Sequence, residues 1–98
     1  MLVHSVYFWL RDDMTAAAVD IFAQDVASLL AIPTVRHGWI GRPASTRRPV
    51  IDHSYSFALT VVFDDLAGHD AYQVDPLHLT FLERQRTAWS RVVIYDSH

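Results

Sequence analysis

The chain has 98 residues and a formal net charge of -3, which predicts a single domain (residues 1–98) without the concentrated basic surface that nucleic acids require. Hydrophobic residues make up 51% of the chain and aromatic residues 12%, so we expect part of this surface to be covered by a second copy. No apolar run is long enough for a membrane helix. The lack of cysteine excludes disulfides and a thiol nucleophile, and it is compatible with a cytoplasmic location.

The first third of the chain is typical of a strand followed by a helix. Residues 2–10 are β-branched and aromatic, which predicts a strand buried on both faces. We do not expect a signal peptide, because no basic segment precedes this run and Arg11-Asp12-Asp13 ends it. Thr15 is a suitable N-cap for a helix over residues 16–30, whose apolar residues recur at helical spacing, and Pro33 ends it.

The middle of the chain predicts two more strands joined by a long loop. Residues 35–41 form the weaker strand, in which Gly38 and Gly41 are expected to mark bends or bulges. Residues 42–53 form a loop of unusual length that is a candidate for a flap. Residues 54–63 alternate aromatic or aliphatic positions with smaller ones, the clearest strand pattern in the sequence.

Two helices and a strand complete the pattern. Asp64 or Asp65 is expected to cap a short helix over residues 66–74, which is followed by a helix over 77–88 and a strand over 91–96. The order β-α-β-β-α-α-β is that of an elaborated ferredoxin-like α+β fold, with helices on one face of a four-stranded antiparallel sheet.

The other face of this sheet is predicted to be open and apolar, which is typical of an association surface. Two such sheets packed face to face form a barrel. We therefore expect a homodimer in the form of a ferredoxin-like dimeric α/β barrel, with no nucleic-acid and no membrane partner.

The break between the last two predicted helices carries the most distinctive residues. Asp75 can cap the second of these helices, and Pro76 fits its first turn. His78 then lies near a helix N-terminus, where the helix dipole favours the neutral imidazole, and Tyr72 lies six residues earlier, across the break. A neutral histidine beside a phenol can perform acid–base chemistry, with His78 as general base and Tyr72 as hydrogen-bond donor to a developing oxyanion. Each residue can equally be structural, His78 by bonding a backbone carbonyl and Tyr72 as a core tyrosine.

Further candidates are mostly apolar. His4 on the first strand is a possible polar contact if its face lines the pocket, although a core histidine is the more common case. Other residues could form an apolar wall around the polar pair or serve only in packing; these are Phe8, Phe22, Phe57, Leu59, Trp89 and Val92.

The sequence gives little support for metal or cofactor chemistry. None of the six histidines has the i, i+4 spacing of a helical metal site, and no phosphate-binding glycine loop or nucleophile elbow is present. We therefore expect no metal site and no cofactor, and expect His37, His69 and His98 to be surface residues.

The Tyr72, Pro76 and His78 spacing after a strand that ends at Phe63 resembles the stress-responsive A/B-barrel (Dabb) family of the dimeric α+β barrel group. The resemblance covers nearly the whole chain. It implies that His78 and Tyr72 match the catalytic pair of a plant polyketide cyclase of this family, and that His4 matches its first-strand histidine. Phe57 stands where that cyclase has a further pocket histidine, and Asp75 stands where the family commonly has histidine.

Three functions follow as hypotheses. The first is a cofactor-independent cyclase or related proton-transfer enzyme acting on a small apolar, aromatic or polyketide-like ketone. The second is a non-catalytic stress-response or ligand-binding module of the same fold. The third is a cofactor-free or haem-linked monooxygenase.

Overall fold

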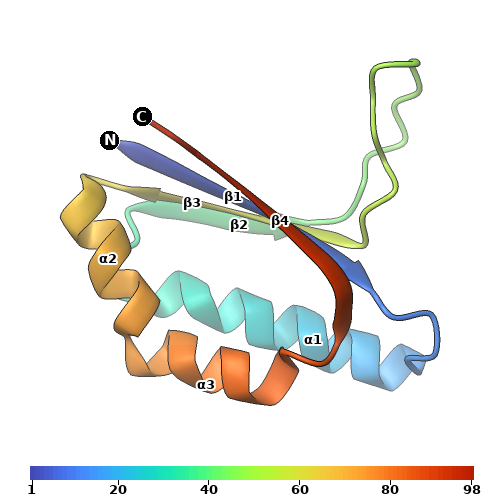
Figure 1. Cartoon of the computed structure of the whole chain (residues 1–98), viewed down its shortest axis with the longest axis horizontal. Helices are drawn as coiled ribbons and strands as arrows, with labels where there is room; N and C mark the ends of the chain where they lie inside the picture. Colours follow the sequence, from blue (N-terminus) through green and yellow to red (C-terminus); the bar gives the residue numbers. More distant parts are fainter.

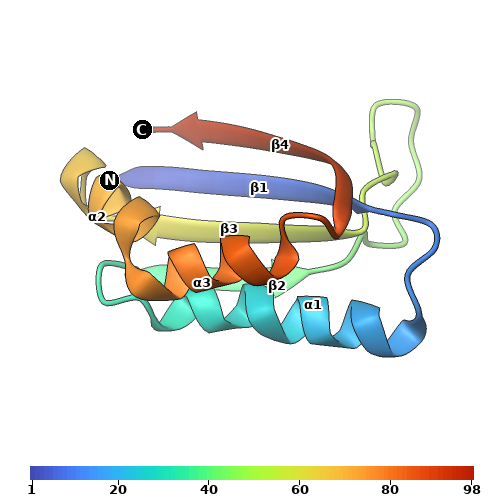
Figure 2. The ribbon, with the colours of Figure 1, turned by 60° about the horizontal axis from the view of Figure 1, so that its bottom comes forward.

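Four strands form one antiparallel sheet, seen nearly edge-on in Figure 1, in the order β2-β3-β1-β4, which can be followed in Figure 2. In this computed structural model, which describes residues 1–98, the strands are β1 (Leu2–Leu10), β2 (His37–Gly41), β3 (Phe57–Phe63) and β4 (Trp89–Ser97). The helices are α1 (Ala16–Ser28), α2 (Leu66–Val74) and α3 (Pro76–Gln85), with a short 3-10 helix, η1 (Leu29–Ala31), after α1. The predicted element order and the ferredoxin-like α+β fold are confirmed.

The sheet has one covered and one open face. Figure 2 shows α1 and α3 packed along one face, with α2 at one end of the sheet and no helix on the opposite side. Alternation along β1, which lies between β3 and β4, sends its even-numbered residues toward the helices; the buried ones are Leu2, His4, Val6 and Phe8. Its odd-numbered residues lie on the open face and are only partly buried.

Helix capping at the α2–α3 break follows the sequence. Asp75 is the N-cap of α3, and its Oδ1 accepts a hydrogen bond from the backbone N–H of Leu77 at 2.9 Å. Pro76 is the first residue of α3, where a missing N–H costs no helical hydrogen bond. Of the two candidate caps for α2, Asp65 is the one that acts, by accepting from the N–H of Gly68.

Gly38 and Gly41 mark neither a bend nor a bulge, which corrects the sequence-based expectation. β2 pairs with β3 in continuous register, and the irregularity in the sheet lies between Trp9 and Leu10 of β1. Gly38 is instead a point of close approach, since a Cβ there would lie 2.6 Å from Cδ2 of Leu30.

Several element ends differ from those expected. β3 begins at Phe57 rather than at residue 54, because the chain before it leaves the sheet: Ser56 still donates its N–H to the carbonyl of Phe8, but no ladder precedes it. α3 ends at Gln85 because the next residues turn, with the N–H of Ala88 bonded to the Gln85 carbonyl.

The loop between β2 and β3 extends away from the sheet on the side opposite the helices (Figure 1). It covers the segment predicted as a flap and contains no helix or strand. None of the helices has the length and apolar character needed to cross a membrane.

Candidate functional site

The break between α2 and α3 places Tyr72 and His78 side by side. Tyr72 lies in the last turn of α2 and His78 in the first turn of α3. Because Asp75 and Pro76 turn the chain sharply between the two helices, the two rings approach to 4.9 Å between centroids, at an angle of 59°. His4 reaches the same place from β1, with its ring 5.8 Å from that of Tyr72.

These three side chains line one cavity of about 210 Å³ between the sheet and α3. Its remaining walls are almost entirely apolar: Val6, Phe8, Leu29, Leu59, Gln73, Phe81, Leu82, Trp89, Val92 and Ile94. An apolar cavity with a few convergent polar groups is the usual form of a small-molecule site.

Burial sets the protonation states in this cavity. Burial lowers the pKa of His78, and the nearby His4 and His69 lower it further. The Gln73 backbone and the Asp75 carboxylate act in the opposite direction and raise the pKa. Burial also lowers the pKa of His4 and raises that of the Tyr72 phenol. The site therefore holds neutral His78 beside a protonated Tyr72. The Nδ1 atom of His78 is buried without a hydrogen-bond partner, a condition that native proteins usually avoid.

Most of the sequence-predicted site residues meet at this cavity. Tyr72, His78, His4, Phe8, Leu59, Trp89 and Val92 all line it. Phe22 and Phe57 do not; they are buried in the core, with their ring centroids 5.7 Å apart. Phe22 supports the wall from behind, through contact with Phe8 at 5.2 Å between centroids.

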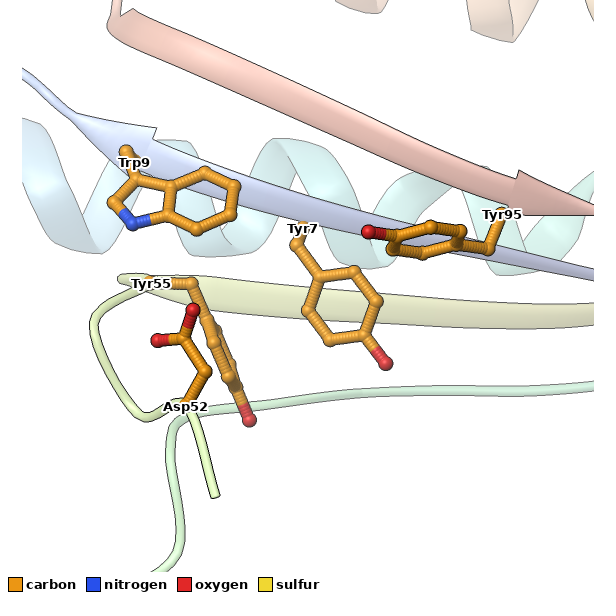
Figure 3. Close-up of a pocket in the computed structure, with 5 residues that line it drawn as sticks. All are labelled: Tyr7, Trp9, Asp52, Tyr55 and Tyr95. Carbon is orange, nitrogen blue, oxygen red and sulfur yellow. The ribbon is translucent and has the colours of Figure 1, made fainter. Parts of the chain in front are cut away.

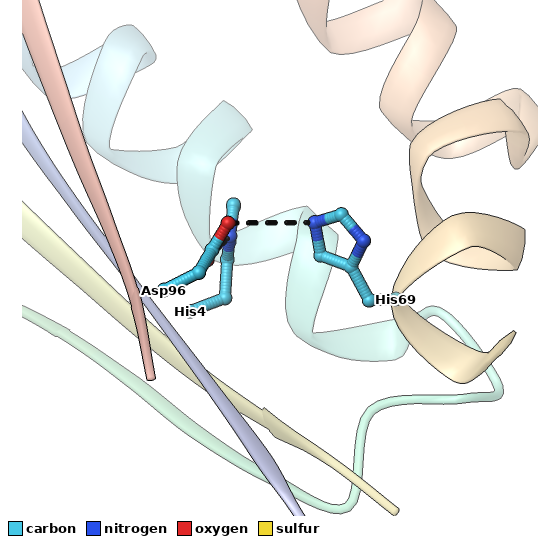
Figure 4. A group of neighbouring side chains, drawn as sticks. All are labelled: His4, His69 and Asp96. Carbon is cyan, nitrogen blue, oxygen red and sulfur yellow. Dashed lines mark hydrogen bonds and ion pairs between the residues drawn. The ribbon is translucent and has the colours of Figure 1, made fainter. Parts of the chain in front are cut away.

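A second polar cluster adjoins the cavity at His4 (Figure 4). Nδ1 of His4 lies 2.5 Å from Oδ1 of Asp96, and Nε2 of His69 lies 3.9 Å from the other carboxylate oxygen. One nitrogen of each histidine and one oxygen of Asp96 lie within 4.8 Å of one another, so these residues are the group best placed to hold a metal ion.

The surface position expected for His69 is wrong, because its side chain is only 15% exposed. One signal in the sequence points to this cluster. His69 precedes Tyr72 by three residues, which places both on one face of α2. Pairing the first and last strands brings Asp96 opposite His4, but the sequence alone does not reveal the register.

Six further residues line the cavity without having been predicted as site residues: Val6, Leu29, Gln73, Phe81, Leu82 and Ile94. Of these, Gln73, Phe81 and Leu82 lie on the two helices. They flank Tyr72 and His78 along α2 and α3, but their side chains carry no pattern that separates a cavity wall from ordinary helix packing.

A larger hollow of about 320 Å³ lies on the open face of the sheet (Figure 3). Its five lining residues are Tyr7, Trp9, Asp52, Tyr55 and Tyr95. Hydrogen bonds from Ser54 lower the pKa of Asp52, so its carboxylate is ionised and is already occupied by those bonds. The hollow contains no histidine, and Ser54 already engages its carboxylate, so we place the candidate chemical site at the smaller cavity.

Comparison with known protein families gives a match over residues 2–98 to the stress responsive A/B barrel domain, Dabb. The chain belongs to the Dabb family. No curated protein sequence matches the chain.

Solved structures share the fold of this Dabb chain. A Dabb family protein with a ferredoxin-like fold from Mesorhizobium loti is 26% identical, with a TM-score of 0.80 over 99% of this chain and 94% of that one. A dimeric ferredoxin-like protein of unknown function from Thermobifida fusca is 23% identical, with a TM-score of 0.79 over 98% and 88% of the two chains. The hydroxynitrile lyase of Passiflora edulis is 18% identical, with a TM-score of 0.80 over 98% and 90%.

Proposed function

We propose that the cavity binds a small, largely apolar ketone, of aromatic or polyketide-like character, and that His78 and Tyr72 carry out a cofactor-independent proton transfer on it. The observation that carries this proposal is the meeting of the two side chains, with rings 4.9 Å apart, in one apolar cavity that also contains His4. A cavity of about 210 Å³ has room for a compact ligand only.

The proposed reaction is an intramolecular aldol-type cyclisation. The neutral imidazole of His78 takes a proton from the carbon next to one carbonyl, and the resulting carbanion forms a bond to the carbon of a second carbonyl in the same molecule. Tyr72 donates a hydrogen bond to the oxygen that gains negative charge, and the proton held by His78 is returned to that oxygen. The burial that keeps His78 neutral and Tyr72 protonated supports these roles.

The direct test is an assay of linear di- and triketones for cyclised product, by liquid chromatography and mass spectrometry, with the wild-type protein and two variants. His78→Ala should abolish product formation. Tyr72→Phe, which removes one oxygen, should lower the rate about 100-fold, the usual effect of losing one oxyanion donor. Equal rates in all three proteins would contradict the proposal, and far-UV circular dichroism would show that the variants are folded.

The second candidate is a binding module that sequesters the same kind of ligand. The apolar walls of the cavity favour binding whether or not a reaction follows. For a binding module, titration calorimetry would detect ligand binding while no ketone is converted.

A monooxygenase of the kind found among related barrels would instead consume oxygen, which an oxygen electrode measures. The Passiflora edulis relative is named as a lyase, so an enzymatic role is known for at least one protein of this fold.

We also propose that the protein is a homodimer that pairs through the open face of the sheet. This face carries exposed aromatic residues that no helix covers, among them Trp39 at 59% and Tyr95 at 66% exposure. Exposed apolar surface of this kind is typical of an interface. Two solved relatives, from Thermobifida fusca and Bacteroides fragilis, are described as dimeric.

We further propose a cytoplasmic location, with which the lack of cysteine is compatible.

A further inference from the structure

We propose that His4, His69 and Asp96 bind one divalent transition-metal ion of the zinc class. The three residues come from β1, α2 and β4, and one potential ligand atom from each lies within 4.8 Å of the others. Two imidazoles and one carboxylate form a ligand set that suits zinc, cobalt and nickel ions rather than magnesium or calcium, which prefer oxygen ligands. This inference does not depend on the proposed ketone chemistry.

Nε2 is the ring nitrogen of His69 that faces Asp96. Nδ1 of His69 lies 3.0 Å from a carboxylate oxygen of Asp70, so Nδ1 carries the proton and donates it to Asp70. Nε2 is then unprotonated in the neutral ring, and the side-chain amide of Gln73 lies 3.2 Å from it as a donor. Nε2 also lies 3.9 Å from the Asp96 carboxylate, so two electron-pair donors approach each other. A cation bound by both atoms would replace the Gln73 hydrogen bond at Nε2 and neutralise the Asp96 carboxylate.

The arrangement around the cluster also matches that of known metal sites. A histidine that binds a metal through one nitrogen usually donates the other N–H to a carboxylate, which fixes the ring, and Asp70 holds this position for His69. On the sheet, backbone pairing fixes His4 opposite Asp96. The site is thus tied to three separate elements before any ion binds.

The spacing requires only small adjustments. Ligands of a tetrahedral zinc ion lie about 3.4 Å apart, given metal–ligand distances of about 2.1 Å. Nδ1 of His4 and the Asp96 oxygen are closer, at 2.5 Å, because a proton now joins them, and an ion would replace this proton. Asp96 is 41% exposed near the end of β4, so its carboxylate can rotate and the ion can enter from solvent. Three protein ligands leave one position for water.

The experiment is a titration of the metal-free protein with Co²⁺, followed by its visible absorption, and competition with Zn²⁺. Wild type should bind one Co²⁺ per chain with an absorption typical of tetrahedral coordination, and Zn²⁺ should remove that absorption. Zn²⁺ should also raise the midpoint of thermal unfolding, because ligands that bind the folded state stabilise it. Asp70→Asn, which leaves all three ligands in place, should weaken binding about 10-fold.

Variants decide between this site and adventitious binding by other histidines. His69→Asn and Asp96→Asn should each abolish the absorption, while His98→Asn, at the exposed C-terminus, should bind as wild type does. Asp96→Asn keeps the shape of the side chain, so it tests the site even if replacement of His69 disturbs α2. Absence of binding in wild type, or equal binding in Asp96→Asn, would overturn the proposal. Neither result bears on ketone conversion by His78 and Tyr72, which is measured separately on metal-free protein.

Discussion

Burial of His78 determines the pH range over which it can act as a base. Its folded-state pKa lies below the ordinary value of 6.5, so the folded protein keeps the ring neutral at pH values where the unfolded chain takes up a proton. The charged or titratable groups around it are His4 on β1, His69 and Tyr72 on α2, and Asp75 at the start of α3. We expect activity to persist below pH 6.5 and to fall as the pH passes through the lowered pKa of His78.

The same shift links stability to pH. Above pH 6.5 the ring is neutral in both states, so its contribution to the free energy of unfolding is constant. Between pH 6.5 and the folded-state pKa only the unfolded chain gains a proton, and the free energy of unfolding falls on acidification. Urea unfolding at a series of pH values should show a shallower acid decline for His78→Gln than for wild type, whereas His98→Gln should follow wild type. An unchanged slope in His78→Gln would contradict this account.

Single residues of the site could be predicted only where a local pattern marked them. Asp75 and Pro76 identify a helix start, and this start fixes the positions of Tyr72 and His78 relative to each other. The burial of His69 could not be predicted, because it depends on β1 and β4, which are far away in the sequence. The core position of Phe22 and Phe57, away from the cavity, also follows from three-dimensional packing that alternation alone does not define.

The α2–α3 break is the element that builds the site. Replacement of Asp75 by Ala removes the acceptor for the Leu77 N–H and should destabilise the protein by about 1 kcal/mol. The start of α3 should also loosen, so ketone conversion should decrease along with stability. Asp75→Asn retains a good capping side chain and should remain close to wild type. Chemical denaturation of the wild type and the two variants measures this effect. If Asp75→Ala and Asp75→Asn are equally stable, the side-chain cap does not stabilise the α2–α3 break.

The β2 strand offers a second test at the scale of one element. In Gly38→Ala the new Cβ would meet Leu30 at 2.6 Å and the Thr60 carbonyl oxygen at 3.1 Å, which should destabilise the protein by about 1 kcal/mol or more. Gly41→Ala on the same strand is the matched control, because nothing lies within 4 Å of its Cβ position. Thermal unfolding should separate the two variants. Similar melting temperatures would mean that the close packing of β2 against η1 is relaxed in solution.

Element types and their order could be predicted because they depend on local periodicity, as in residues 2–10 and 54–63. Element ends were less predictable. The residues before Phe57 have the composition of a strand but leave the sheet. A glycine within a strand, such as Gly38, indicates a bend or bulge, but here it is a point of close approach to Leu30. In both cases a neighbouring element decides the outcome, and the local sequence does not contain that information.

At the scale of the whole molecule, the open sheet face carries part of the aromatic residues of this short chain, among them Tyr7, Trp39 and Tyr95. Light scattering should give the mass of a dimer at micromolar concentration. Tyr95→Asp places a charge on this face, on the edge strand β4, and should shift the protein toward monomer, whereas Leu79→Asp, 52% exposed on α3, should remain dimeric. A monomeric wild type would leave the aromatic face without a partner and would refute the barrel.

The most direct test of the central claim is hydrogen–deuterium exchange next to the carbonyl of a small ketone in D₂O, followed by NMR. This exchange needs only the first proton transfer, so it does not require the natural substrate. If His78 is the base in this cavity, wild type should accelerate exchange, Tyr72→Phe should retain a small part of the acceleration, and His78→Gln should abolish it. If His78→Gln accelerates exchange as much as wild type, the cavity is not the site of proton transfer.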